Sequence, residues 1–187
     1  MNAHETRAAN GAHTTDGMPH GSTSLTPFLA IPRAADAIHF YRDVFGARVV
    51  DVTEMPSPAQ DADASRPSSE PPGPPARVVV HAELDFGSGH LQLGEPVPDY
   101  HLVAAPEGED DCYSIGLYVP DVDATVERAV AAGATVREAP ADFVSGDRFA
   151  SIRDPFGVRW SVMTRVEDLS EEESAARVAE WARNFQG

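Results

Sequence analysis

The chain has 187 residues, of which 42% are hydrophobic and 24% charged, so it can form one globular domain or two small fused modules. Its formal net charge of −16 disfavours nucleic acid and anionic membranes as partners, because phosphate groups repel such a surface. The sequence contains no lysine and a single cysteine, Cys112, which excludes a Schiff-base lysine, an internal disulfide and a multi-cysteine zinc site.

The sequence also carries no signal for a membrane or for export. No apolar run approaches the roughly 18 residues of a membrane span. The N-terminus lacks the basic start and apolar stretch of a signal peptide. We therefore expect a soluble, cytoplasmic protein.

Two segments are expected to lie outside regular structure. Residues 1–23 are small and polar without periodicity, which predicts a disordered tail. Residues 55–77 hold seven of the sixteen prolines, which is incompatible with the interior of a helix or strand. The second segment therefore predicts a long loop inserted between two strands.

An internal repeat organises the rest of the chain. Residues 29–50 (LAIPRAADAIHFYRDVFGARVV) and 117–136 (LYVPDVDATVERAVAAGATV) each show an apolar strand, a proline, a helix, Gly-Ala and a β-branched strand. Gly46 and Gly133 are placed as left-handed caps at the ends of the two helices. The predicted apolar stripes are Ala34, Ile38, Tyr41 and Phe45 in the first helix and Val122, Val126, Ala129 and Val130 in the second.

The second halves of the two copies also correspond. Residues 78–94 and 148–164 both predict hairpins, each with a Phe-Gly pair. Each copy is then a β-α-β-β-β module, the first over residues 24–96 and the second over 113–166, with residues 97–112 as the loop between them. The predicted fold class is α+β.

The chain closes with a predicted helix in residues 167–187. Ser170 and Glu173 form a capping box, and acidic residues precede arginines as the helix dipole favours. The predicted apolar face comprises Val178, Trp181, Ala182 and Phe185. This face should dock on the domain or on a partner subunit.

These motifs resemble the vicinal oxygen chelate superfamily, the group of glyoxalases, bleomycin-resistance proteins and extradiol dioxygenases, and within it the PhnB-like branch. The matching strings are TPFLAI (26–31), AIHFYRDVFGA (37–47), HAEL (81–84), DVDATVERAVAAGA (121–134), DRFASIRDPFGVRWSV (147–162) and EDLSEEE (167–173). The resemblance implies that each module curls into half of a cup, within one chain or across a homodimer. It also implies that four inward side chains can hold a divalent metal that polarises vicinal oxygens.

The four metal positions implied by the resemblance hold neutral residues here. They are Thr26 (or Pro27 if the loop shifts by one), Gln92, Ser114 and Ser161. Hydroxyl and amide groups are poor ligands for catalytic zinc, nickel or iron, which prefer imidazoles and carboxylates. We therefore expect no bound metal and no cofactor.

Strand alternation predicts which other side chains face the cup. Residues two apart on a strand share a face, so Gln92 brings His90 with it. The predicted ligand-binding set is Thr26, Phe28, His90, Gln92, Ser114, Tyr118, Ser161 and Met163. This mixture of aromatic, apolar and neutral polar groups suits a small organic ligand.

Three residues of the 81–95 stretch (HAELDFGSGHLQLGE) are candidates for catalysis. His81 and Glu83 share a face and could act as a general base with its orienting carboxylate, and His90 is a second candidate base. The same alternation also suits a half-buried strand whose polar face is solvated. A metal held by His81, Glu83 and His90 is the weakest of these alternatives.

Charged residues in the second module and in the loop before it have two interpretations each. Arg148 and Arg153 could bind an anionic ligand, although salt bridges on this acidic surface are favoured. The loop carboxylates Glu107, Glu109, Asp110 and Asp111 are interpreted as a solvated charge run, with weak Ca²⁺ binding as the minor alternative.

The sequence thus favours a metal-independent protein that binds a small molecule, with roles in drug sequestration or specialised metabolism. An alternative is an enzyme of lyase, isomerase or dioxygenase type, using a rearranged metal site or metal-free His/Glu acid–base catalysis. A weaker alternative is an interaction module that uses the C-terminal helix.

Overall fold

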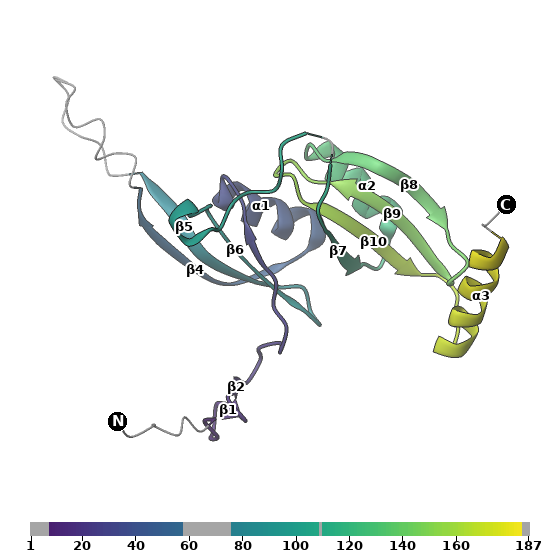
Figure 1. Ribbon diagram of the computed structural model, residues 1–187, viewed down its shortest axis with the longest axis horizontal. Helices are drawn as coiled ribbons and strands as arrows, with labels where there is room; N and C mark the ends of the chain where they lie inside the picture. Colours follow the sequence, from purple (N-terminus) through teal and green to yellow (C-terminus); the bar gives the residue numbers. More distant parts are fainter. Residues whose placement is uncertain (1–7, 58–75, 109, 185–187) are drawn as a thin grey trace.

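The computed structural model describes residues 8–57, 76–108 and 110–184, and it contains two four-stranded sheets that each carry one helix (Figure 1). The first module begins with a short strand and a helix and then adds three strands. Its elements are β3 (Phe28–Ala30), α1 (Ala34–Phe45), β4 (Arg48–Pro56), β5 (Arg77–Asp85) and β6 (His90–Gly94).

The second module repeats the same order of elements. These are β7 (Ser114–Tyr118), α2 (Val122–Ala131), β8 (Thr135–Asp142), β9 (Asp147–Arg153) and β10 (Arg159–Arg165). The strand orders, β3-β6-β5-β4 and β7-β10-β9-β8, are also equivalent. In each sheet the first and last strands of the module pair in parallel and the other neighbours are antiparallel. The predicted α+β fold with two β-α-β-β-β modules is confirmed.

The helices form where the apolar stripes and caps predict them. Gly46 ends α1 with a φ of 75°, and Gly133 follows α2 with a φ of 97°, both in the left-handed region that glycine tolerates best. The side chain of Asp121 accepts a hydrogen bond from the Ala124 amide and begins α2. One residue of the predicted apolar stripe lies outside the buried face of α2. Val130 is 46% exposed, and Ala129 is the last buried residue of the helix.

One hydrophobic core runs through both modules. Trp160, on the helix-covered side of β10, contacts the rings of Tyr41 and Phe45 on α1 at centroid distances of 5.1 and 4.7 Å. Tyr41 donates to the buried Asp154 carboxylate at 2.7 Å, and Trp160 donates to the same oxygen at 3.0 Å. The modules are therefore joined through their helix-covered faces, and the opposite face of each sheet, here called the open face, lies on the outside.

Three segments lie outside the two modules. In the expected tail, β1 (Thr14–Thr15) and β2 (Met18–Pro19) form a small hairpin around Asp16-Gly17, whose positive φ values suit a two-residue turn. The Asp-Gly pair is the sequence signal that would have predicted this hairpin. A short 3-10 helix, η2 (Pro98–Tyr100), follows the first module, and α3 (Glu171–Asn184) ends the described chain.

The structure agrees only in part with the predictions for the C-terminal helix and the proline-rich insertion. Ser170 and Glu173 make the predicted reciprocal capping bonds at the start of α3: the Glu173 carboxylate accepts from the Ser170 amide, and the Ser170 hydroxyl accepts from the Glu173 amide. Trp181 is 38% exposed and packs edge-on against Phe143, at 5.2 Å between ring centroids, so α3 docks loosely on the second module. Phe185, Glu109 and residues 58–75 of the insertion lie outside the described residues, whereas the flanks of that insertion belong to β4 and β5. None of the described helices has the length and apolar content needed to cross a bilayer.

Candidate functional site

The structure divides the predicted ligand-binding residues between two open faces. In the first module, Phe28 on β3 is paired with Gln92 on β6 and lies on the open face. In the second, Ser161 on β10 lies beside Gly116 on β7, and its hydroxyl is 2.8 Å from the Ser114 hydroxyl. The register pairs Met163 with Tyr118, so strand alternation correctly predicts which side chains share a face.

His90 is the centre of a polar network on the first module. Its Nδ1 lies 2.5 Å from Glu83 Oε1, and its Nε2 lies 3.8 Å from Asp85 Oδ1. Gln92 Nε2 donates to the other Glu83 oxygen at 3.3 Å. Only 10% of the His90 side chain is exposed. A histidine held between two carboxylates at the end of a rigid hairpin has a fixed ring orientation, which is what ligand binding or proton transfer requires.

The hydrogen bond from His90 also sets the charge of Glu83. It holds the pKa of the Glu83 carboxyl below its ordinary value, with Gln92 and the nearby His81 contributing in the same direction and burial opposing them. Glu83 therefore stays ionised around neutral pH, so that it accepts hydrogen bonds and stabilises positive charge on an imidazole.

His81 shares a face of β5 with Glu83, as predicted, but among the described residues the hydrogen-bond partners of the Glu83 side chain are His90 and Gln92. The Glu83 carboxylate turns to His90 and Gln92 on the neighbouring strand, while the His81 ring lies 6.3 Å from the Phe28 ring, measured between centroids. Residues i and i+2 do share a face on β5, but the closer partner across the strand pair has the better geometry. The His–Glu pair on the open face is thus His90 with Glu83.

A cavity of about 310 Å³ lies at the seam where the tip of the β5–β6 hairpin meets β7. His90 from the first module and Tyr118 from the second both line it, so the structure brings these two predicted residues together. Its other walls are mostly apolar and include Pro27, Phe86, Leu91, Ile115, Leu117 and Trp160. The volume is at the small end of the range of about 300–1,000 Å³ for ligand pockets.

The four positions where the resemblance implies metal ligands do not fit a metal. Thr26 Oγ1 is engaged with Thr23 Oγ1 at 2.9 Å, and the Ser114 and Ser161 hydroxyls are bonded to each other. Among the described residues, no three His, Cys, Asp or Glu side chains are grouped in a way that could hold a metal ion. Neutral hydroxyls that are already hydrogen-bonded offer a divalent cation no charge and are weak ligands for it.

The open face of the second module carries Arg159 and Ser151, which the sequence analysis did not single out, beside Arg153, which it did. Arg159 Nε donates to the hydroxyl of Ser151, which is fully buried although it lies on the open face. Arg153 pairs with Arg159 in the β9–β10 register and shares this face. The alternation of polar and apolar residues in RFASIRD (148–154) and RWSVM (159–163) was the sequence signal for this polar face. Arg148 binds Asp123 and Asp142, and Arg153 Nε lies 3.2 Å from Asp111 Oδ1, so both arginines form the salt bridges that the sequence favoured.

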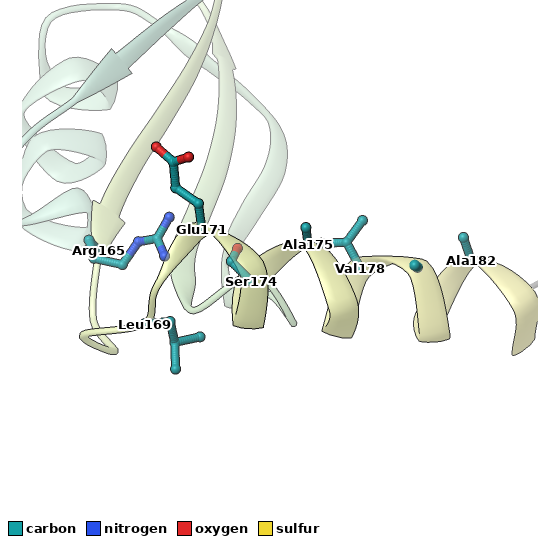
Figure 2. Close-up of a pocket in the computed structure, with 8 residues that line it drawn as sticks. Arg165, Leu169, Glu171, Ser174, Ala175, Val178 and Ala182 are labelled. Carbon is teal, nitrogen blue, oxygen red and sulfur yellow. The ribbon is translucent and has the colours of Figure 1, made fainter.

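A second, larger cavity lies along α3. It is a shallow groove of about 570 Å³, lined mainly by apolar side chains such as Ala175, Val178 and Ala182 (Figure 2). Arg165 and Leu169 lie at the end of the groove where the chain enters α3. It offers few polar groups to orient a ligand, so the seam cavity is the better candidate site.

Comparison with known proteins gives consistent matches over most of the chain. Residues 18–162 match the model of the "Glyoxalase/Bleomycin resistance protein/Dioxygenase superfamily". An uncharacterised protein of Mycobacterium tuberculosis H37Rv is 31% identical over 160 residues, which cover 83% of this chain and 82% of that protein.

Two solved structures share the fold. The PhnB protein of Bacillus cereus is 15% identical, with a TM-score of 0.51 over 76% of this chain and 99% of its own. The fosfomycin resistance protein FosX of Listeria monocytogenes, solved with Mn(II) and sulfate, is 13% identical, with a TM-score of 0.53 over 84% and 98%. At these identities the likeness concerns the fold alone.

Proposed function

Because the chain belongs to the Glyoxalase/Bleomycin resistance protein/Dioxygenase superfamily, we propose that it binds a small organic molecule beside His90. The observation that carries the proposal is that His90, held by Glu83 in a network that includes Gln92, also lines the seam cavity. A few oriented polar groups against aromatic and aliphatic walls are the usual make-up of a small-molecule site. Sequestration of a drug or handling of a specialised metabolite fits such a site.

The proposal uses no metal, because the residues at the implied metal positions are neutral and already hydrogen-bonded to neighbours. Metal analysis of the purified full chain tests this directly. Stoichiometric zinc, nickel, manganese or iron that is lost on His90→Ala would contradict the proposal.

Ligand-observed NMR with a panel of small aromatic acids, amides and alcohols tests binding itself. For compounds that bind, His90→Ala should weaken the affinity by about ten-fold, equivalent to about 1.4 kcal/mol. His39→Ala is the matched control, because His39 is exposed on α1. If no compound distinguishes the two variants, the site is not at His90.

Acid–base catalysis is a second candidate function, and the short Glu83–His90 contact favours it. With Nδ1 held by the carboxylate, Nε2 is the atom that would accept a proton from a bound compound, and Glu83 would stabilise the resulting imidazolium. For an enzyme, incubation with a bound compound yields product by mass spectrometry. Glu83→Gln then abolishes turnover while the compound still binds, whereas a pure binding protein leaves the compound unchanged.

We further propose that the chain acts as a homodimer in which the open face of one copy's first module meets that of the other copy's second module. Both faces leave aromatic residues uncovered, with Phe28 36% and Tyr118 56% exposed. Since the modules of one chain are joined through their other faces, a second copy can supply the complement.

Sedimentation velocity on the full chain tests the dimer. The expected mass is twice the 20.0 kDa of the chain. Tyr118→Glu should shift the population towards monomer, because it places a charge in the contact, whereas Val130→Glu on the outer surface of α2 should not. A monomer at every concentration tested would contradict this assembly.

A further inference from the structure

Two polar residues that line the seam cavity, one from each module, share a feature: each has a hydrogen bonded to a carboxylate. His90 Nδ1 lies 2.5 Å from Glu83 Oε1, and the Tyr118 hydroxyl donates to Asp147 Oδ1 at 3.2 Å. Neither Glu83 nor Asp147 lines the cavity. These hydrogens are therefore committed to groups behind the cavity wall, and the two side chains have acceptor atoms left for a ligand.

The Glu83 carboxylate decides which nitrogen of His90 carries the hydrogen. Glu83 is ionised around neutral pH, because the His90 hydrogen bond lowers its pKa, and an ionised carboxylate accepts but cannot donate. Nδ1 must therefore be the donor, and in a neutral imidazole Nε2 then keeps a free lone pair. Nε2 lies 3.8 Å from Asp85 Oδ1, so the charge of Asp85 adds to the attraction for a donor placed beside it.

Asp147 acts on Tyr118 in the same way. Its side chain is only 9% exposed, and Arg165 Nε at 2.8 Å and the Ser145 hydroxyl at 2.7 Å also donate to it. Arg165 also interacts with the Tyr118 hydroxyl, whose oxygen must accept because a guanidinium group can only donate. Arg165 itself lines the groove along α3 and not the seam cavity. The Tyr118 oxygen is therefore a second acceptor.

The remaining lining of the cavity supplies little that would bind an acid. Among the described residues that line it there is no arginine, and the chain contains no lysine. Ser88 lines the cavity at the tip of the hairpin, but its hydroxyl can donate or accept and so favours neither class of ligand. The ionised Glu83 behind His90 repels a second negative charge, whereas a ligand O–H or N–H gains a hydrogen bond to Nε2.

We propose that the seam cavity selects ligands that present a hydrogen-bond donor to it, namely an alcohol, phenol or amide N–H group, and rejects organic acids. The inference rests on the proposed small-molecule function and names the chemical class of its ligand. Glu83 is then a positioning residue: it fixes the hydrogen of His90 on Nδ1, and His90 Nε2 contacts the ligand.

Long-range 1H–15N NMR spectra of the unmodified chain test the acceptor without any ligand. The neutral imidazole of His90 should carry its hydrogen on Nδ1 and none on Nε2. Glu83→Gln should admit the other tautomer, because an amide can donate to Nδ1 as well as accept from it. A neutral ring with its hydrogen on Nε2 in the unmodified chain would overturn the proposal.

Ligand-observed NMR with benzyl alcohol, benzyl methyl ether and benzoate tests the selection, at a pH where the same spectra show a neutral His90 ring. The alcohol and the ether share the aromatic ring but differ in the donor hydrogen, so their affinity ratio reports the hydrogen bond. The alcohol should bind about five-fold tighter than the ether, and benzoate should bind most weakly. Glu83→Gln should bring the ratio towards one. Glu127→Gln, which changes the net charge equally at an exposed position of α2, should leave it unchanged.

The outcomes separate this inference from the proposed function. Equal affinities of the alcohol and the ether, or benzoate binding as tightly as the alcohol, with His90→Ala weakening both, would overturn the donor selection and leave a small-molecule site at His90. If none of the three compounds distinguishes His90→Ala from His39→Ala, the site at His90 fails and the inference fails with it. The tautomer and the affinity ratio are both measured on the unmodified chain, so they decide the matter even where a variant does not fold.

Discussion

The short contact between His90 and Glu83 shows how one residue acquires its role from its neighbours. Glu83 has two histidines within reach on the open face, and it binds the one on the adjacent strand rather than the one two positions away on its own strand. Asp85, which also faces His90, is held by Arg48 at 2.6 Å and by the amide of Gly87 at 2.7 Å. Both carboxylates are therefore engaged by named partners, and each has a pKa below its ordinary value.

Glu83→Gln should make the stability of the protein less dependent on acid pH. The folded-state pKa of Glu83 lies below 4.5, its ordinary value, chiefly because of the His90 hydrogen bond. The unfolded chain then binds more protons between the two values, so the stabilisation is complete above 4.5 and is lost as pH falls through the folded pKa. At neutral pH the variant should lose about 1–2 kcal/mol of unfolding free energy.

Urea denaturation between acid and neutral pH measures this difference. The gap between the unmodified chain and Glu83→Gln should narrow as the pH is lowered. Glu107→Gln, at an exposed loop position, is the control. Its unfolding free energy should depend on pH in the same way as that of the unmodified chain. A gap that is constant with pH would mean that the Glu83 charge does not stabilise the fold.

At the scale of elements, the end of β6 is tied to the beginning of α1. The residue before the helix, Arg33, has a left-handed φ of 59° and makes no side-chain cap. Glu95 supplies the cap instead: its carboxylate accepts from the amides of Ala34 at 2.8 Å and Arg33 at 3.1 Å. Gly94 lets the strand approach closely, because a Cβ there would lie 2.5 Å from the Val80 carbonyl oxygen.

Glu95→Ala should destabilise α1 specifically. Losing two bonds at a helix N-terminus, together with the favourable charge–dipole interaction, should cost about 1–2 kcal/mol of unfolding free energy. The amides of Arg33 and Ala34 should exchange hydrogen faster, because they lose their acceptor. Glu127→Ala, exposed on α2, is the control. Unchanged exchange at Ala34 would contradict the remote cap.

At the scale of the whole molecule, one buried polar group links the modules. Asp154 belongs to the second module, and it accepts from Tyr41 of the first, from Trp160 and from the amides of Phe156 and Val158. Burial, reinforced by the Asp154 charge, raises the pKa of the Tyr41 hydroxyl well above its ordinary value, so this group stays a donor. A carboxylate satisfied by donors from both modules fixes how they sit together.

Tyr41→Phe should weaken both modules together. Removing the hydroxyl takes one donor from a buried carboxylate, at a cost of about 1–3 kcal/mol. Because the core is continuous, denaturation should remain a single transition with a lower midpoint and an unchanged slope. Tyr100→Phe is the control, since Tyr100 is 78% exposed. Two separate transitions in the unmodified chain would contradict a shared core.

The sequence alone predicts the repeat, the order of the elements, the helix ends at Gly46 and Gly133, and the shared face of Phe28 and Gln92. These features follow from local periodicity and backbone preference, which act over a few residues. The alternation that puts Ser161 on the open face also puts its neighbour Trp160 in the core, where it is 1% exposed.

Which partners these residues contact depends on how distant segments of the chain fold together. The pairing of Glu83 with His90, the cap from Glu95 and the contact of Asp111 with Arg153 each depend on side-chain direction between segments that periodicity does not relate. The joining of the modules through their helix-covered faces likewise depends on how two apolar surfaces pack. Because packing is a property of the whole core, no local pattern encodes it.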